Sequence, residues 1–427
     1  MRHILKRIIS DFHHRPYPEM TFRHKNIEIN LEKIVAIIGP RRAGKTYMLF
    51  QLMKELEHQG VPKHQILYIN FEDERLELEG HYDVILEAYF ELYPEAEISQ
   101  CYFFFDEIQE LHQWEKFVRR IYDTQTKHIF ITGSNAGFLS KEIASSLRGR
   151  AISYEIMPLS FKEFLQFKHI DMSDRSSIRN ASMVNRAYED YILWGGYPEL
   201  VNVDSHLKIK ILHEYFNVMI YRDLIEIYGI RDVSMLKYQI KRMISSFTKE
   251  FSINKLYNDF KSQGIAISKN LIYQTTERIF SIYMMACVEK YDPSVIKREI
   301  SNKKIYLYDN GFASVSNYIF FEDRGKLLEN MVFSNLRHFT EEIFFLKNGW
   351  ECDFLAFISS KNSVLIQVTE CLDSDTVGRE LKGLEQARKR ISASECLILT
   401  EKISAGIQLP EWVKATSVCD WLLDDEV

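Results

Sequence analysis

A glycine-rich loop at residues 39–46 has the residue types and spacing to bind phosphates. Its sequence is Gly-Pro-Arg-Arg-Ala-Gly-Lys-Thr, a complete Gly-x-x-x-x-Gly-Lys-Ser/Thr motif. A β-branched apolar run precedes it at residues 34–38, and a helical pattern follows at residues 47–57. This is the strand, loop and helix context that the motif requires. A chance match in a glycine turn is the alternative, and this context argues against it.

The chemistry expected of this loop is nucleotide binding with magnesium. Glycine tolerates the backbone torsions that let the chain wrap around a phosphate, and free N–H groups at a helix start attract anions. Lys45 is expected to reach the β- and γ-phosphates, and the Thr46 hydroxyl to ligate Mg²⁺. The predicted nucleotide-binding residues are Gly39, Pro40, Arg41, Arg42, Ala43, Gly44, Lys45, Thr46 and Tyr47.

An acid pair, Asp106 and Glu107, ends the apolar run at residues 102–105. A parallel strand buried on both faces is continuously apolar, and ligands of open α/β sheets bind at the carboxyl ends of their strands. Asp106 is therefore predicted to hold Mg²⁺, mostly through water. Glu107 is predicted to polarise the attacking water. The alternative for such a pair is a solvated strand end with a helix N-cap.

Further candidates for catalysis follow the strand pattern at residues 128–131. Ser134 and Asn135 come after this strand, where a polar side chain can reach the γ-phosphate or the attacking water. An ordinary polar turn is the alternative. Arg148 and Arg150 are candidates for an arginine finger, supplied in cis or by a neighbouring subunit. Most arginines are simply exposed on the surface, which is the alternative for this pair.

Composition restricts the class of protein. The chain has 427 residues, 46% of them apolar, and six scattered cysteines without metal-ligand spacing. No apolar run approaches the length of a membrane span, so we expect a cytoplasmic protein without a membrane partner. The net charge is −6, but residues 235–310 hold 13 Lys and Arg against 7 Asp and Glu. This local excess is a weak indication of a polyanionic partner.

The elements needed to position these residues suggest an α/β protein of four parts. Residues 1–157 alternate strand and helix patterns, which predicts a parallel sheet in a P-loop ATPase core, with an amphipathic helix at residues 4–12 packed on it. Residues 158–232 are helical with a Gly-Gly-Tyr-Pro turn, as in a lid beside the nucleotide. Residues 233–312 fit a winged helix-turn-helix, and residues 313–427 are again α/β.

The predicted winged helix has one helix that could enter a DNA major groove. Its candidate DNA-contacting residues are Lys269, Asn270, Tyr273, Gln274 and Arg278. A winged helix that only packs against protein is the equal alternative.

The chain resembles the bacterial and archaeal AAA-type P-loop ATPases that carry a C-terminal restriction-endonuclease-like domain of unknown function. The matching stretches are residues 39–46, 68–73 (Tyr-Ile-Asn-Phe-Glu-Asp), 105–109 (Phe-Asp-Glu-Ile-Gln) with Trp114, 131–135 (Ile-Thr-Gly-Ser-Asn), 158–164 (Pro-Leu-Ser-Phe-Lys-Glu-Phe), 195–198 (Gly-Gly-Tyr-Pro) and 329–333 (Glu-Asn-x-Val-Phe). The resemblance implies an AAA-type fold with a helical lid and a winged helix. It also implies binding and hydrolysis of ATP. The choice of adenine comes from the resemblance, since nothing in the residues alone selects the base.

The nuclease comparison holds for only part of the motif. Nucleases of this fold use an acid from a helix, an acid from a strand, and Glu/Gln-x-Lys on the next strand. Glu329 and Asp353 fit the two acids, and Gln367 fits the third position, but Thr369 stands where the lysine belongs. A threonine cannot stabilise the developing charge as an ammonium would. We therefore expect a degenerate nuclease fold kept for binding or partner contact.

Two functions of different classes follow. The first is an ATP-driven motor or switch associated with double-stranded DNA. The second is a signalling or scaffold ATPase whose nucleotide state exposes a surface to a protein partner or a second copy of the chain. An active nuclease, resting on Glu329 and Asp353, is the third and weakest hypothesis.

Overall fold

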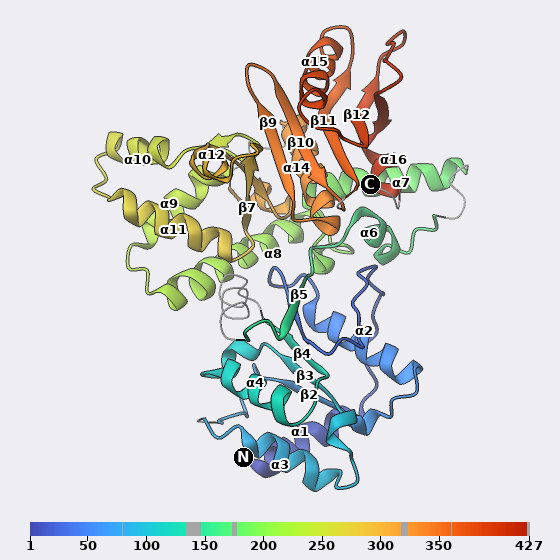
Figure 1. Ribbon diagram of the computed structural model, residues 1–427, viewed down its shortest axis with the longest axis vertical. Coiled ribbons are helices and arrows are strands. Elements are labelled where there is room, and N and C mark those ends of the chain that lie inside the picture. Colours follow the sequence, from blue (N-terminus) through green and yellow to red (C-terminus); the bar gives the residue numbers. More distant parts are fainter. Residues whose placement is uncertain (79, 134–146, 173–176, 317–322, 360, 425–427) are drawn as a thin grey trace. The chain divides into compact units, whose positions relative to one another are not determined.

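The computed structural model describes residues 1–427 except 79, 134–146, 173–176, 317–322, 360 and 425–427 (Figure 1). The chain divides into two compact units, Met1–Ile156 and Met157–Val427. The first boundary predicted from the sequence differs from this division by one residue. The further predicted boundaries, after residues 232 and 312, remain predictions.

The first unit is built on a parallel sheet of five strands. These are β1 (Ile34–Ile38), β2 (Ile66–Asn70), β3 (Tyr102–Asp106), β4 (Ile129–Thr132) and β5 (Ala151–Glu155). Their order is β2-β3-β4-β1-β5, and every neighbouring pair is parallel. The sequence predicts the first four strands because each is an apolar run. The edge strand β5 is not predicted, since it is partly exposed and lacks such a run.

Helices cover both faces of this sheet. Alternate residues of a strand point to opposite faces, so the apolar runs supply two cores. One core contains residues of α1 (Arg2–His14), α3 (Asp83–Leu92) and α4 (Trp114–Thr124), and the other contains residues of α2 (Lys45–His58). The expected N-terminal amphipathic helix is confirmed as α1. Its residues Leu5 and Ile9 are fully buried in the first of these cores.

The second unit begins with helices. They are α6 (Phe161–Phe167), α7 (Ile178–Trp194), α8 (Ser205–Val218) and a π-helical turn at Met219–Glu226. A capping box fixes the start of α6, because Ser160 accepts from the backbone of Glu163 and Glu163 caps in return. The Gly-Gly-Tyr-Pro turn follows α7, as the sequence predicts.

The elements expected of a winged helix come next. They are α9 (Val233–Ile244), α10 (Ile253–Ser262), α11 (Lys269–Ser281) and the antiparallel strands β7 (Met285–Lys290) and β8 (Lys303–Leu307). A small separate core, which includes Met235, Phe260 and Ile272, joins the three helices. Two short elements were not predicted: the strand β6 (Glu250–Phe251), which pairs with β8, and the helix α12 (Val295–Ile300).

The rest of the unit is the α/β part that was expected to be restriction-endonuclease-like, called the nuclease-like part below. Its strands are β9 (Ile343–Lys347), β10 (Glu351–Phe357), β11 (Ser363–Leu372), β12 (Glu395–Ile403) and β13 (Lys414–Ser417). The long helix α14 (Arg324–Phe339) precedes them, and α15 (Val377–Arg388) lies between β11 and β12 in the sequence.

These two parts share one sheet. Its eight strands run in the order β13-β12-β11-β10-β9-β7-β8-β6 (Figure 1). The antiparallel pair of β7 and β8, called the winged ribbon below, therefore continues the C-terminal sheet. The junction is the parallel pairing of β7 with β9, where Glu289 lies opposite Phe344 and Lys290 opposite Phe345. A continuous apolar core extends from α6 to α16 (Val418–Leu423). The winged ribbon is therefore attached to the nuclease-like fold by backbone hydrogen bonds as well as by packing.

Candidate functional site

The phosphate-binding loop connects β1 to α2 and uses glycine where other residues would not fit. Gly39 has φ +140°, and a Cβ there would lie 2.2 Å from the Ile156 carbonyl oxygen. Gly44, directly before α2, has φ +98°. Both positions favour glycine, the first for space as well as conformation. Because α2 starts at Lys45, its free N–H groups adjoin the loop.

Lys45 is buried beneath the loop. Its Nζ donates to the carbonyl oxygens of Gly39, at 3.1 Å, and Pro40, at 3.0 Å. Arg41 forms a long ion pair with Glu72, at 3.8 Å. Tyr47 is half exposed at the start of α2. The lysine predicted to bind the β- and γ-phosphates is thus held within the loop itself.

Asp106 ends β3 and is fully buried. Its Oδ2 accepts from the Tyr68 hydroxyl at 3.0 Å, and its Oδ1 accepts from the Thr132 hydroxyl at 2.5 Å. The Thr46 hydroxyl also lies near this carboxylate and acts to lower its pKa. Burial raises the pKa of Asp106, the charge of Glu107 adds to this rise, and the three hydroxyls oppose it. The structure therefore brings the two predicted metal ligands, Thr46 and Asp106, together.

This pair fits a magnesium ion chemically. Mg²⁺ prefers oxygen ligands and is commonly held by one or two carboxylates together with waters and substrate phosphates. One buried carboxylate beside one hydroxyl, next to a phosphate-binding loop, matches that requirement. Thr46 and Asp106 are the residues that would hold the ion.

Glu107 follows in a left-handed backbone conformation, with φ +50°. Its N–H donates to the Thr132 hydroxyl at 2.9 Å, so Thr132 links the backbone of Glu107 to the carboxylate of Asp106. The Gln109 amide donates to the Glu107 carboxylate. Glu107 is held by neighbours on both sides while its side chain stays partly accessible.

Two supporting residues were missed by the sequence analysis. Thr132 and Tyr68 both bond Asp106, and each is a hydroxyl residue within an apolar strand, a signal that could have identified them. The predicted candidates Ser134 and Asn135 lie outside the described residues. Their proposed contact with the γ-phosphate remains a prediction.

The arginine pair lies at the amino-terminal ends of the strands, opposite the end that carries the phosphate-binding loop. The turn that carries Arg148 leads into β5, and the Arg150 carbonyl accepts from the N–H of Ile34, where β1 begins. The phosphate-binding loop follows the opposite end of β1. Arg150 is also paired with Asp123, at 2.9 Å. The geometry therefore does not support a finger role in cis, and Arg148 remains a candidate only for the site of a neighbouring subunit.

Arg23 is a neighbour of the loop that was not predicted from the sequence. Its Nη1 donates to the Ala43 carbonyl oxygen at 2.9 Å. Its backbone is fixed to α2, because its N–H donates to the Gln51 side chain at 2.8 Å and its carbonyl accepts from the same side chain at 3.1 Å. A second buried cation thus supports the loop from the segment before β1.

The predicted DNA-contacting residues lie on α11 in different environments. Lys269, Asn270, Tyr273 and Gln274 are exposed. Arg278 is half-buried, with its guanidinium 4.6 Å from the centre of the Tyr228 ring. This cation–π contact occupies Arg278 within the unit, and the other four form an exposed face of the helix.

The predicted nuclease-like residues Glu329, Asp353 and Gln367 come together from α14, β10 and β11. The N–H of Asp353 donates to Gln367 Oε1 at 2.8 Å. Glu329 and Asp353 share a contact with Lys304 on β8, which the sequence analysis did not select. The arrangement is thus nuclease-like in its carboxylates and contains an unpredicted lysine.

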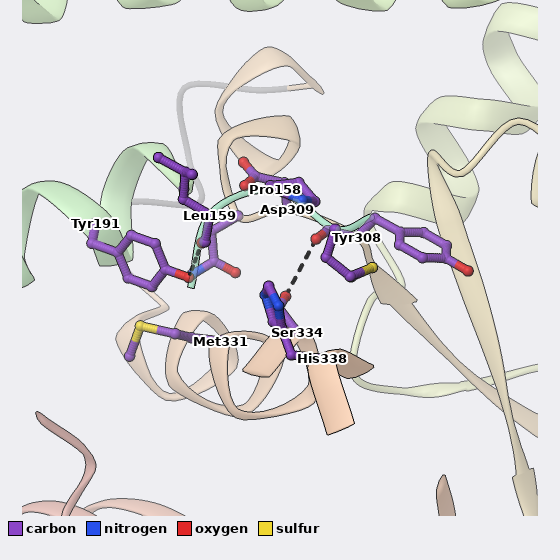
Figure 2. A pocket seen from close by; sticks show the side chains of 11 residues that line it. Pro158, Leu159, Tyr191, Tyr308, Asp309, Met331, Ser334 and His338 are labelled. Carbon is purple, nitrogen blue, oxygen red and sulfur yellow. Dashed lines mark hydrogen bonds between the residues drawn. The ribbon is translucent and has the colours of Figure 1, made fainter. Parts of the chain in front are cut away.

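A small cavity beside the Gly-Gly-Tyr-Pro turn belongs to the packing of the turn and is not a ligand site. It is lined by Leu159, Tyr191, Asp309 and Ser334, among others, and holds about 10 Å³, enough for one water at most (Figure 2). The Asp309 carboxylate accepts from the N–H of Gly196 at 2.7 Å and from that of Gly311 at 2.8 Å. This buried carboxylate fixes the turn that follows α7.

Asp309 should make the stability of the second unit depend on pH. Burial raises the pKa of Asp309 to about 7, although its two backbone hydrogen bonds oppose the rise. A raised native pKa means that its contribution to stability is present at low pH and is lost as the pH rises towards 7. Between pH 5 and 8 we expect wild type to lose about 2–3 kcal/mol relative to Asp309→Asn. Denaturant unfolding of both proteins at each pH measures this difference, and a pH-independent difference would contradict it.

The comparisons with known proteins agree with this geometry. The AAA domain family matches residues 31–165, and a domain of unknown function (DUF8612) matches residues 185–319. The uncharacterized protein MJ1544 of Methanocaldococcus jannaschii is 39% identical over 86% of this chain and 81% of its own length. An uncharacterized protein of Haemophilus influenzae is 27% identical over 91% of this chain and 94% of its own. The chain belongs to the family of AAA-type P-loop ATPases that includes MJ1544.

Solved structures add little to this assignment. The ORC1 protein of Aeropyrum pernix, solved in complex with DNA, is 12% identical and covers 76% of this chain and 92% of its own, with a TM-score of 0.31. A score this low does not define a shared arrangement. Among the described residues, no helix is long and apolar enough to cross a membrane.

Proposed function

We propose that this protein hydrolyses ATP with Mg²⁺ at the loop of residues 39–46. The observation that carries the proposal is the place of the fully buried Asp106 carboxylate at the end of β3, near the Thr46 hydroxyl at the start of α2. These groups come from a phosphate-binding loop and a neighbouring strand end, and both are oxygen ligands. Together with Lys45 beneath the loop, they supply what phosphoryl transfer needs: positioning and positive charge.

Each residue has a separate role in this mechanism. The loop N–H groups bind the phosphates, and Lys45 exchanges its carbonyl partners for phosphate oxygens. Tyr68 and Thr132 keep the Asp106 carboxylate in one orientation. Glu107 accepts a hydrogen bond from the attacking water. This bond orients a lone pair of the water oxygen towards the γ-phosphorus. Bound Mg²⁺ neutralises charge on the β- and γ-phosphates.

Lys45→Ala tests the binding half of this proposal. We expect nucleotide affinity to fall about 10- to 100-fold, because one charge-assisted hydrogen bond to phosphate contributes about 1.5–3 kcal/mol. Titration with a fluorescent ATP analogue measures the change. Lys54→Ala, which removes a charge further along α2 where Lys54 lies over the Phe22 ring, is the matched control and should bind like wild type. Unchanged affinity in Lys45→Ala would overturn the site.

The second proposed function is association with double-stranded DNA through α11. Its support is the exposed polar face of Lys269, Asn270, Tyr273 and Gln274, together with the excess of basic residues at 235–310. Phosphate contacts release counterions, so such binding weakens steeply as salt rises. The alternative is a signalling or scaffold ATPase regulated by a protein partner or a second copy of the chain.

ATPase measurements with duplex DNA at low and high salt separate these alternatives. A DNA-associated switch should be stimulated at low salt, and Lys269→Ala should lessen the stimulation. Lys382→Ala, which removes a lysine from α15 in the nuclease-like part, is the control and should not. Turnover that ignores DNA at every salt concentration would favour the partner-regulated ATPase.

A further inference from the structure

A buried lysine lies at the centre of the nuclease-like carboxylates. Lys304 on β8 is 3% exposed. Its Nζ lies 3.1 Å from Glu329 Oε1, 2.8 Å from Glu351 Oε1 and 3.6 Å from Asp353 Oδ1. Three carboxylates from α14 and β10 thus surround one ammonium from the winged ribbon.

The other donors to these carboxylates are also supplied by the protein. The Tyr306 hydroxyl donates to Glu329 Oε1 at 2.6 Å. The N–H of Val368 donates to Asp353 Oδ2 at 2.9 Å, and Lys347 pairs with Glu351 Oε2 at 3.0 Å. Each acid therefore has a second donor besides Lys304, so the cluster is a satisfied network.

The third position of the nuclease motif is occupied in the same way. Gln367 Oε1 accepts from the N–H of Asp353, and its Nε2 donates to the Glu351 carbonyl at 3.1 Å. The helix α15 packs closely over this point, because a Cβ at Gly383 would lie 2.2 Å from the Glu351 carbonyl oxygen and 2.5 Å from Gln367 Nε2. Gln367 holds two strands together and is enclosed by a helix.

Electrostatics require a cation here. Gathering three partly buried carboxylates around one point is costly unless a positive charge and hydrogen bonds compensate. In a nuclease of this fold, divalent ions supply that charge. Here the ammonium supplies it: burial alone would lower the pKa of Lys304, but the surrounding anionic groups raise it well above its ordinary value.

We propose that the Lys304 ammonium is the resident cation of this cluster, and that it fills the position between Glu329 and Asp353 which a divalent ion would need. The C-terminal α/β part then acts as an anchor for the winged ribbon, and phosphodiester cleavage is not its function. This inference is independent of the proposed ATP hydrolysis, since it involves the second unit alone.

The missing motif lysine gains an explanation from this arrangement. Thr369 stands at the position of that lysine, and its hydroxyl donates to the Cys371 carbonyl oxygen at 3.2 Å. Lys304 reaches the carboxylates from β8, a strand outside the nuclease motif. Its contacts tie β8 to α14 and β10, so they add an ionic link to the backbone pairing of β7 with β9.

Binding of Mn²⁺ to the full-length, nucleotide-free protein tests the proposal. All proteins carry Asp106→Asn, which removes the carboxylate of the proposed nucleotide site. The parent should bind no Mn²⁺ at the cluster, and adding Asp353→Asn should change nothing. Lys304→Met should gain one Mn²⁺ per chain, because it removes the ammonium that the three carboxylates share. Isothermal titration or the Mn²⁺ spin-resonance signal measures the stoichiometry.

Lys347→Met is the matched control. It also removes an ammonium from Glu351, but Lys347 is 44% exposed and its loss leaves Lys304 in place, so no Mn²⁺ site should appear. A folded Lys304→Met that gains no Mn²⁺ would overturn the proposal. So would Mn²⁺ bound by the parent and lost on adding Asp353→Asn. If Lys304→Met does not fold, the comparison of the parent with Asp353→Asn decides alone.

Discussion

Glu107→Gln should still bind ATP while its turnover falls by roughly 10²- to 10⁴-fold, the usual contribution of a group that orients and activates an attacking water. The substitution keeps the size of the side chain and removes its negative charge. The backbone N–H of Glu107 stays bonded to Thr132, so the geometry of Asp106 should persist. Steady-state phosphate release measures kcat, and equilibrium titration measures the affinity for ATP.

Glu110→Gln is the control for this prediction. Glu110 lies three residues further along the chain and is exposed. Its substitution by glutamine changes the local charge by the same amount. It should hydrolyse ATP at the wild-type rate. Normal turnover in Glu107→Gln would show that another residue activates the water, and loss of ATP binding would show that Glu107 supports the site structurally.

The nucleotide site was largely predictable because its parts are local in sequence. The loop, the preceding strand and the following helix occupy one continuous segment, and Asp106 ends a strand whose apolar run marks it as buried. The sequence could not place Arg148. Its position depends on the parallel pairing of β5 with β1. This pairing places the turn before β5 at the amino-terminal end of the strands, opposite the loop. That pairing joins segments more than a hundred residues apart.

The second unit shows the same limit more strongly. Most winged-helix and nuclease-like elements were predicted where they occur because they have their own periodicity, but β9, β13 and α16 were not predicted. Their union in one sheet depends on two pairs of residues between β7 and β9, and no local pattern announces it. Lys304 was missed for this reason. As part of a strand it resembles an edge lysine, and only the tertiary fold brings Glu329, Glu351 and Asp353 to it.

The Gly-Gly-Tyr-Pro turn was predicted, but its physical reason was not. Gly195 ends α7 with φ +75°. The carboxylate of Asp309 comes so close that a Cβ at Gly195 would lie 1.8 Å from its Oδ1 and 2.2 Å from its Cγ. The glycine therefore serves the close approach of a buried acid as well as the conformation of the turn.

Gly195→Ala should consequently destabilise the second unit by about 4 kcal/mol or more. The added methyl must displace Asp309, whose bonds to the N–H groups of Gly196 and Gly311 contribute about 1.5–3 kcal/mol each. The backbone conformation of Gly195, with φ +75° and ψ −162°, is one that only glycine adopts readily, and it costs another residue about 1–3 kcal/mol. The melting temperature should fall by about 8–16 °C. Calorimetry with and without ATP identifies the transition, since ATP should stabilise the first unit. Gly264→Ala, at φ +72° with open space around it, should cost only about 1–2 kcal/mol, and an equal loss in both variants would show that the turn depends on backbone conformation alone.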